Sequence, residues 1–241
     1  MPDVLLLAMP HKRQFGKDAD ERINDCFPAC IAMLADITVD NAAIITQADH
    51  PNQYVTIARG IQALRYYGIR SRYERPLTND ALRGYLAARQ PVILLIKYAA
   101  VPSHLRGVPT FTGSHFILAN GHDANGIFYH DPLQATGYSY LTDKQLERAM
   151  SAFDKFENLP YQAVVIEQEY HELEPAAIEL ITGQLPENGK PYPDGQTAQN
   201  IPEVTRDIRV RRLLYELGVD PARDDWLEMA LAKVEKLKKL L

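Results

Sequence analysis

The segment that most constrains the fold spans residues 113–133, with the sequence GSHFILANGHDANGIFYHDPL. Two runs of strand-forming residues flank a His-Asp-Ala-Asn-Gly turn, which is typical of an antiparallel hairpin. A continuous apolar run, PVILLIKYA at residues 91–99, comes shortly before it and is typical of a central strand that is covered on both faces. The sequence therefore predicts a sheet whose middle strands are buried.

The remainder of the first 170 residues alternates between helical and strand patterns. Helices are predicted over residues 25–36, 56–68, 78–90 and 141–153, and further strands over residues 3–9, 69–75 and 162–168. The pattern changes after residue 172, and residues 183–202 are rich in Gly, Pro, Asn and Gln. We therefore predict a compact α+β domain over residues 1–172, a linker or extended arm over 173–202 and a helical tail over 203–241.

Composition and charge exclude several classes of function. A chain of 241 residues with 46% hydrophobic content can bury one sizeable core. The net charge of -5 gives no general case for binding nucleic acid, and no apolar run reaches the roughly 20 residues that span a bilayer. The first residues, MPDVLLLAMPHKR, lack the pattern of a signal peptide. Two cysteines do not make a disulfide framework, so we expect free thiols in a reducing compartment, most simply the cytoplasm.

The two cysteines, Cys26 and Cys30, occupy chemically different positions in the predicted helix 25–36. Cys26 lies at the start of the helix, which Asn24 or Asp25 can cap, and there the backbone N–H groups and the helix dipole stabilise a thiolate. Cys30 lies one turn further in, on the apolar stripe. We therefore predict Cys26 as a nucleophile and Cys30 as a packing residue; the alternative for Cys26 is an ordinary buried cysteine.

A cysteine nucleophile needs a histidine as general base and an acceptor that orients the histidine. The hairpin offers His115 and Asp131. If its loop spans residues 122–124, the two side chains are directly opposed, and if it spans 122–126 they lie diagonally on one face. A loop of two or four residues would put them on opposite faces. A contact between His115 and Asp131 therefore requires a loop with an odd number of residues.

The other histidines have simpler interpretations. His130 alternates out of phase with Asp131 and is expected to be a strand residue, His122 falls in the turn, and His104 lies in a loop that could line a cleft. A metal site is conceivable by count, but strand alternation divides its candidate ligands between two faces, so it ranks below the Cys–His interpretation. These candidate ligands are His115, His122, Asp123, His130 and Asp131.

With these residues in view, the chain resembles the C39-like branch of the papain-fold cysteine peptidases over about residues 4–168. The resemblance rests on four segments in order: NDCFPACIAML, IARGIQALRYYGIRSRY, LRGYLAARQPVILLI and GSHFILANGHDANGIFYHDP. In that family an Asp-Cys-x-Pro-Ala pattern opens the central helix, and a Gly-His-Phe pattern with a later Asp-Pro supplies the base and its orienting acid. The resemblance implies a papain-like α+β fold, in which the N-terminal helix packs on an antiparallel sheet. It also implies Cys26 as nucleophile, His115 as base, Asp131 as orienting acid and no cofactor.

Two positions depart from the family pattern. Members usually carry a glutamine about six residues before the cysteine, and its side-chain amide helps to form the oxyanion hole. Here that position is Asp20, whose carboxylate would repel an oxyanion. A short insertion over GKDADE could loop out and return Gln14 to this place, beside the backbone N–H of Cys26. Phe27 stands where a glycine is common and is expected to narrow the cleft.

These features predict a cysteine peptidase, of bacterial or phage type, that hydrolyses a bond in a peptide or protein substrate through an acyl-enzyme. The alternatives are a catalytically inactive papain-like scaffold or binding protein, and an acyl- or amide-transferring enzyme that uses the same pair. Residues 203–241 carry an apolar stripe that fits a short coiled coil, a docking helix or packing on the same chain. They are thus the expected element for a homo-oligomer or a partner protein. The stripe consists of Leu227, Leu231, Val234, Leu237 and Leu241.

Overall fold

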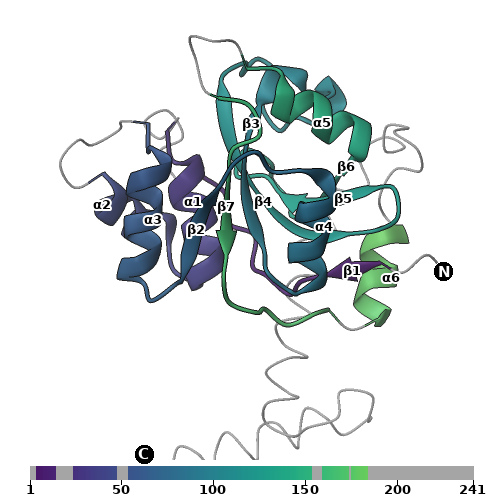
Figure 1. The fold of residues 1–241 in the computed structure, drawn as a ribbon, viewed down its shortest axis with the longest axis horizontal. Coiled ribbons are helices and arrows are strands. Elements are labelled where there is room, and N and C mark those ends of the chain that lie inside the picture. The colour runs from purple at the N-terminus through teal and green to yellow at the C-terminus, as the bar shows by residue number, and fades with distance from the viewer. Residues whose placement is uncertain (1–3, 15–23, 48–53, 154–158, 174, 184–241) are drawn as a thin grey trace, which may run out of the picture. The chain divides into compact units, whose positions relative to one another are not determined.

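The computed structural model describes residues 4–14, 24–47, 54–153, 159–173 and 175–183. Their strands pair antiparallel in a seven-stranded sheet of order β2-β7-β3-β4-β5-β6, with β1 paired to β4 (Figure 1). The predicted antiparallel sheet is confirmed, and the apolar run 91–99 supplies a central strand. The strands are β1 (Leu5–Leu6), β2 (Ser71–Glu74), β3 (Val92–Lys97), β4 (Ser114–His122), β5 (Gly126–His130), β6 (Ser139–Thr142) and β7 (Ala163–Ile166).

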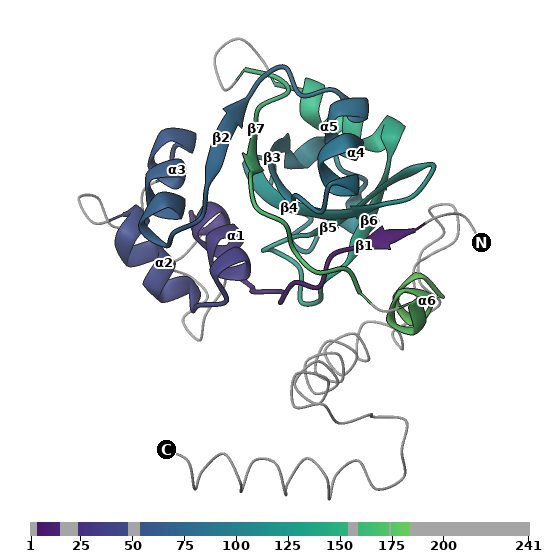
Figure 2. The same cartoon turned by 60° about the horizontal axis from the view of Figure 1, so that its bottom comes forward.

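Side-chain alternation along the central strands divides the core into two clusters, one on each face of the sheet. Ile93 and Leu95 of β3 join the cluster that contains α1, α2 and α3, whereas Val92 and Leu94 join the cluster that contains α4 and α5 (Figure 2). Strand β3 is apolar from Val92 to Ile96 because both of its faces are covered there. The expected packing of the N-terminal helix on the sheet is confirmed. The helices are α1 (Cys26–Ala35), α2 (Val39–Thr46), α3 (Ile57–Tyr66), α4 (Asn79–Ala87) and α5 (Asp143–Ser151).

Some elements differ from the sequence-based expectations. Helix α2 and strand β6 are not predicted from the sequence. The expected strand 3–9 is reduced to β1 and a single bridge between Leu7 and Glu172.

The segment 173–202 is not an extended arm from its start. The N–H of Leu173 donates to the carbonyl of Leu6 at 2.8 Å, and α6 (Pro175–Gly183) is helical. The rest of the expected linker and the whole of the expected tail, residues 203–241, lie outside the described residues.

The turn of the β4–β5 hairpin has an even length, so the expected odd loop is wrong. His122 and Ile127 form the last strand pair, which leaves residues 123–126 as the connection. The Asp123 carboxylate stabilises this turn by accepting hydrogen bonds from the N–H groups of Asn125 and Gly126, at 2.7 and 2.9 Å.

A β-bulge at Asn120 then restores the side-chain phase that the even turn would have lost. Gly121 pairs with Phe128, but Ala119 pairs with Tyr129, so one extra residue enters β4 at this point. A shift of one residue exchanges the two faces of a strand. The bulge therefore returns the predicted histidine and aspartate to the same face, in a diagonal rather than an opposed arrangement.

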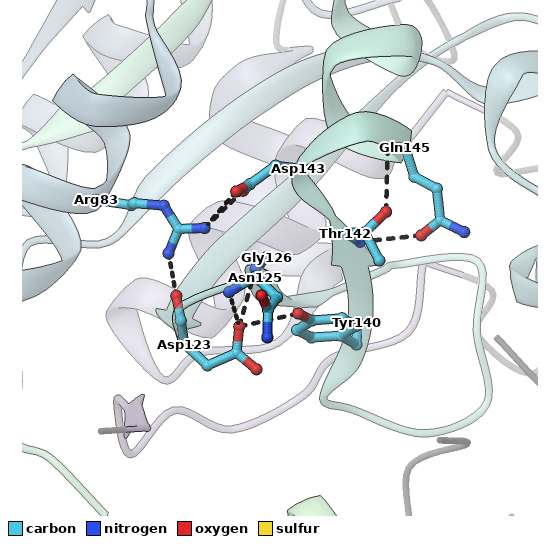
Figure 3. A network of polar contacts seen from close by, with 8 residues as sticks. All are labelled: Arg83, Asp123, Asn125, Gly126, Tyr140, Thr142, Asp143 and Gln145. Atoms are coloured by element: carbon cyan, nitrogen blue, oxygen red, sulfur yellow. Dashed lines mark hydrogen bonds and ion pairs between the residues drawn. The ribbon is translucent and has the colours of Figure 1, made fainter. Parts of the chain in front are cut away.

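A polar network fixes the hairpin turn to the helices that flank it (Figure 3). Arg83 of α4 donates to the backbone carbonyl of Asp123 and to both carboxylate oxygens of Asp143, at 2.6 and 2.7 Å. Asp143 is the first residue of α5, and Tyr140 of β6 donates to the Asp123 carboxylate at 2.9 Å. One guanidinium thus joins α4, the hairpin and α5.

Replacing Arg83 by alanine is expected to lower the free energy of unfolding by about 1–2 kcal/mol, because a partly buried ion pair with Asp143 and the hydrogen bond to the Asp123 carbonyl are lost. Chemical denaturation followed by circular dichroism would measure it. The control is Arg65→Ala, an exposed arginine on α3, where the expected change is below about 0.5 kcal/mol. Equal losses in the two variants would contradict a bracing role for Arg83.

Among the residues that the structure describes, no single helix is long and apolar enough to cross a membrane. Helices α1 and α2 reach the required length and hydropathy only when taken together, and they are bent by 119° relative to each other.

Candidate active site

Cys26 is the first residue of helix α1, as the sequence predicts. Asp25 occupies the N-cap position, but its side chain makes no capping hydrogen bond; instead it accepts from the Gln47 amide at 2.7 Å. The expectation of a side-chain cap from Asp25 is therefore wrong. The thiol lies at the positive end of the helix, which favours negative charge there, and Cys26 is 4% exposed.

The neighbours of Cys26 in α1 belong to the core. Cys30 is fully buried, and burial raises the pKa of its thiol well above the usual value, so it is a neutral packing residue. Phe27 is also fully buried, with its ring 4.6 Å from that of Phe116 and directly over Gly60. A Cβ added at Gly60 would lie 2.1 Å from the Phe27 ring. The expectation that Phe27 narrows a cleft is wrong, because its ring fills the interior.

His115 and Asp131 lie together, and the structure places Cys26 beside them. The Nε2 atom of His115 is 2.7 Å from the Oδ1 atom of Asp131, and both side chains are buried. The Cys26 side chain interacts with the imidazole as well and contributes to the raised pKa of His115. Since Nε2 is bonded to the carboxylate, Nδ1 is the nitrogen left for the sulfur.

The electrostatic surroundings of His115 favour its charged form. Burial lowers the pKa of the imidazole, but the charge and hydrogen bond of Asp131, followed by the contact with Cys26, outweigh burial and raise this pKa to about 9. The imidazole therefore binds a proton readily beside the carboxylate and the thiol. This arrangement supports transfer of the thiol proton to the histidine.

The sequence did not indicate how the Asp131 carboxylate is held. Its Oδ1 atom also accepts from the N–H of Leu133 at 2.8 Å, and its Oδ2 atom accepts from the Tyr98 hydroxyl at 2.7 Å. Tyr98 follows β3 directly, and β3 pairs with β4 so that Ile96 is opposite His115. Only the register of β3 against β4 could have placed Tyr98 near His115 and Asp131. This register is a property of the folded sheet and is not visible in the sequence.

Gln14 is buried and lies against the segment that carries Asp131. Its backbone N–H donates to the carbonyl of Pro132 at 2.9 Å. Asp20 and the whole of the predicted GKDADE insertion fall in residues 15–23, outside the described residues.

Tyr54 is a further aromatic residue near the thiol that the sequence did not indicate. Its ring stacks on Phe116 at 5.8 Å, and it is 36% exposed. Burial, together with the charge on Cys26, raises the pKa of its phenol. Tyr54 therefore forms part of the surroundings of Cys26.

His11 also contacts the site, since its Nε2 atom is 2.9 Å from the backbone carbonyl oxygen of Asp131, whereas His130, His122 and His104 have other surroundings. His130 is fully buried, with Nδ1 accepting from the N–H of Tyr138 and Nε2 bonded to the carbonyl of Met9. His122 ends β4, and His104 is exposed on the single turn η2 (Ser103–Leu105). Within the described ranges, no three or more His, Cys, Asp or Glu side chains form a group that could hold a metal ion.

Comparison with solved structures gives the fold a family context. One match is a C39-like peptidase from Bacillus anthracis, 14% identical, with a TM-score of 0.49, covering 70% of this chain and 100% of that chain. The fold is similar to that of C39-like peptidases. Another match is a double glycine motif protease from an AMS/PCAT transporter in complex with its leader peptide, 12% identical, with a TM-score of 0.43, covering 69% of this chain and 99% of that one.

No protein-family model matches the chain, and no curated protein matches it. Identities this low concern the fold alone, so the chemistry of the site rests on its own residues.

Proposed function

We propose that the chain is a cysteine peptidase that hydrolyses a peptide or amide bond in a peptide or protein substrate. In this proposal Cys26 is the nucleophile, His115 the base and Asp131 the group that orients the imidazole. The observation that carries the proposal is the position of His115, whose Nε2 atom is hydrogen-bonded to Asp131 and whose pKa is raised by Asp131 and by the nearby Cys26 side chain.

The reaction follows from this geometry. The thiol of Cys26 gives its proton to Nδ1 of His115, and the thiolate attacks the carbonyl carbon of the substrate. The carbon–nitrogen bond then breaks while His115 protonates the leaving amine, which leaves a thioester on Cys26. His115 next accepts a proton from a water that attacks the thioester, and a carboxylic acid and the free thiol result. Asp131 accepts a hydrogen bond from Nε2 throughout and keeps the ring in place.

Selective alkylation tests this assignment without a known substrate. Iodoacetamide at neutral pH is expected to label Cys26 fast and Cys30 slowly, and His115→Ala is expected to remove the difference in reactivity that the imidazole provides. Peptide mapping by mass spectrometry measures both sites in one sample. Equal, slow labelling of the two cysteines would refute the proposal.

The same measurement decides the scaffold alternative. The low exposure of Cys26, 4%, is the observation that favours a binding protein without turnover. Such a protein would give slow labelling at Cys26 that does not depend on His115, whereas a peptidase or an acyl transferase would give fast, His115-dependent labelling.

We propose further that the Gln14 side-chain amide and the backbone N–H of Cys26 stabilise the oxyanion. The support is the burial of Gln14 and its backbone contact with Pro132, the residue after Asp131. Gln14→Ala is expected to lower hydrolysis of a p-nitrophenyl ester by about 10²–10³-fold. Alkylation of Cys26 forms no oxyanion, so its rate is expected to stay within about twofold of wild type. A parallel loss in both reactions would indicate damage to the Cys–His pair and contradict this role.

The expected partners of residues 203–241, a second copy or another protein, remain a proposal for the part of the chain that the structure does not describe.

A further inference from the structure

The carboxylate of Asp131 is fixed through both of its oxygens. It is fully buried, and Oδ1 accepts from Nε2 of His115 and from the N–H of Leu133. Oδ2 accepts from the Tyr98 hydroxyl at 2.7 Å. Donors on both oxygens set the plane of the carboxylate, and this plane in turn sets the direction in which Oδ1 meets the imidazole.

Tyr98 is itself held so that its single hydroxyl proton points to Asp131. The N–H of Gly107 donates to the Tyr98 oxygen at 2.8 Å, which occupies one lone pair. The ring is 1% exposed, and its centroid lies 4.8 Å from that of His115 in an edge-to-face contact. Tyr98 therefore touches both members of the pair, one through its hydroxyl and the other through its ring.

Loss of the hydroxyl would leave a buried carboxylate oxygen without its donor. Hydrogen bonds to charged groups are among the stronger ones in proteins, so their loss is costly. The carboxylate can reduce that cost by rotating toward another donor, and rotation weakens its hold on His115. The described titratable groups whose charges act on Asp131 or on His115 are His11, Cys26, Cys30, Tyr98 and Tyr129.

We propose that Tyr98 is a positioning residue for the reaction, and that its hydroxyl keeps the Asp131 carboxylate oriented so that the imidazole of His115 faces Cys26. This inference rests on the proposed function. It adds to the site a side chain that acts through Asp131 and not on the substrate.

The test is the pH dependence of Cys26 alkylation by iodoacetamide in the full chain. In Tyr98→Phe the acid limb of the profile is expected to move up by about one pH unit, because an imidazole that Asp131 holds less firmly stabilises the Cys26 thiolate less. At a given pH on that limb, labelling then falls about tenfold, as a one-unit shift requires, whereas labelling at pH 8 is nearly unchanged.

A second variant keeps the test informative if Tyr98→Phe does not fold. A 3,5-difluorotyrosine at position 98 keeps the hydroxyl and nearly the same ring but is a stronger hydrogen-bond donor, so the acid limb is expected to move to lower pH. Tyr138→Phe is the matched control, because it removes a buried hydroxyl that donates to the carbonyl of Leu7 at 2.8 Å. It is expected to lower stability and to leave the profile in place.

The outcomes separate this inference from the proposed function. If both Tyr98 variants give the same pH profile as wild type while His115→Ala still slows labelling, only the role of Tyr98 is overturned. Labelling that is indifferent to His115 would overturn the proposed function and this inference with it.

Discussion

A Cys26→Ala variant is expected to keep its fold and to lose all measurable peptide cleavage, because the atom that attacks the carbonyl is gone. His115→Ala is expected to retain the sulfur but to lower the rate by about 10²–10⁴-fold, the usual contribution of a positioned general base. The two losses are not additive, since the residues act as one unit. The double variant is therefore expected to match Cys26→Ala.

Cleavage can be measured on a mixture of synthetic peptides, with new N-termini identified by mass spectrometry. Cys30→Ala is the control, because Cys30 is fully buried in the core and carries no proposed role in the chemistry. It is expected to lower stability by about 1 kcal/mol and to leave cleavage in place. Cleavage by Cys26→Ala at the wild-type rate would refute the assignment of the nucleophile.

The second large effect concerns acid stability and His130. This imidazole is fully buried and accepts from the Tyr138 N–H at 2.9 Å through Nδ1, so the bond from Nε2 to the carbonyl of Met9, at 3.1 Å, is a donated one. The neutral ring satisfies both contacts, whereas a protonated ring could no longer accept from Tyr138. Burial, followed by the charge of His11, lowers the pKa of His130 to about 3.

The sign of the effect follows from linkage. The unfolded histidine has a pKa near 6.5, so below that pH the unfolded state binds more protons than the folded state. The contribution of His130 to stability is fully present above about pH 6.5 and is lost as the pH falls toward 3. It amounts to a few kcal/mol.

A His130→Gln variant isolates this contribution. A glutamine can accept from one partner and donate to the other but does not titrate. Denaturation of wild type and variant between pH 7 and pH 3.5 is expected to show a smaller loss of unfolding free energy in the variant. His104→Gln, at an exposed histidine, is expected to follow the wild type. A His130→Gln curve parallel to that of the wild type would contradict the argument.

The sheet could be predicted from the sequence because its signals are local. The apolar run of β3 and the strand runs of the hairpin report burial directly. The hairpin register could not be predicted, because the turn and a β-bulge each exchange the two faces of the strand, and the two exchanges cancel. The turn over residues 123–126 has an even length and the bulge at Asn120 adds one residue. The sequence-based argument reached the right pair, His115 and Asp131, on an incorrect account of the turn.

In the candidate site, too, local features could be predicted from the sequence and long-range contacts could not. Cys26 could be placed from its position at a helix start and from the family resemblance. The hydrogen bond from Tyr98 to Asp131 joins residues 33 positions apart, and it depends on how the end of β3 lies against the segment after β5. No motif in the sequence carries that information. The role of Asp25 was missed for a similar reason, since its partner Gln47 is 22 residues away.

The measurement that tests the central claim most directly is the mass of the protein during turnover of p-nitrophenyl acetate, quenched in acid. The account predicts an acetyl group on the sulfur of Cys26, located by peptide mapping, and predicts that His115→Ala suppresses its formation. An adduct on another residue, or ester hydrolysis with no adduct at Cys26, would contradict it.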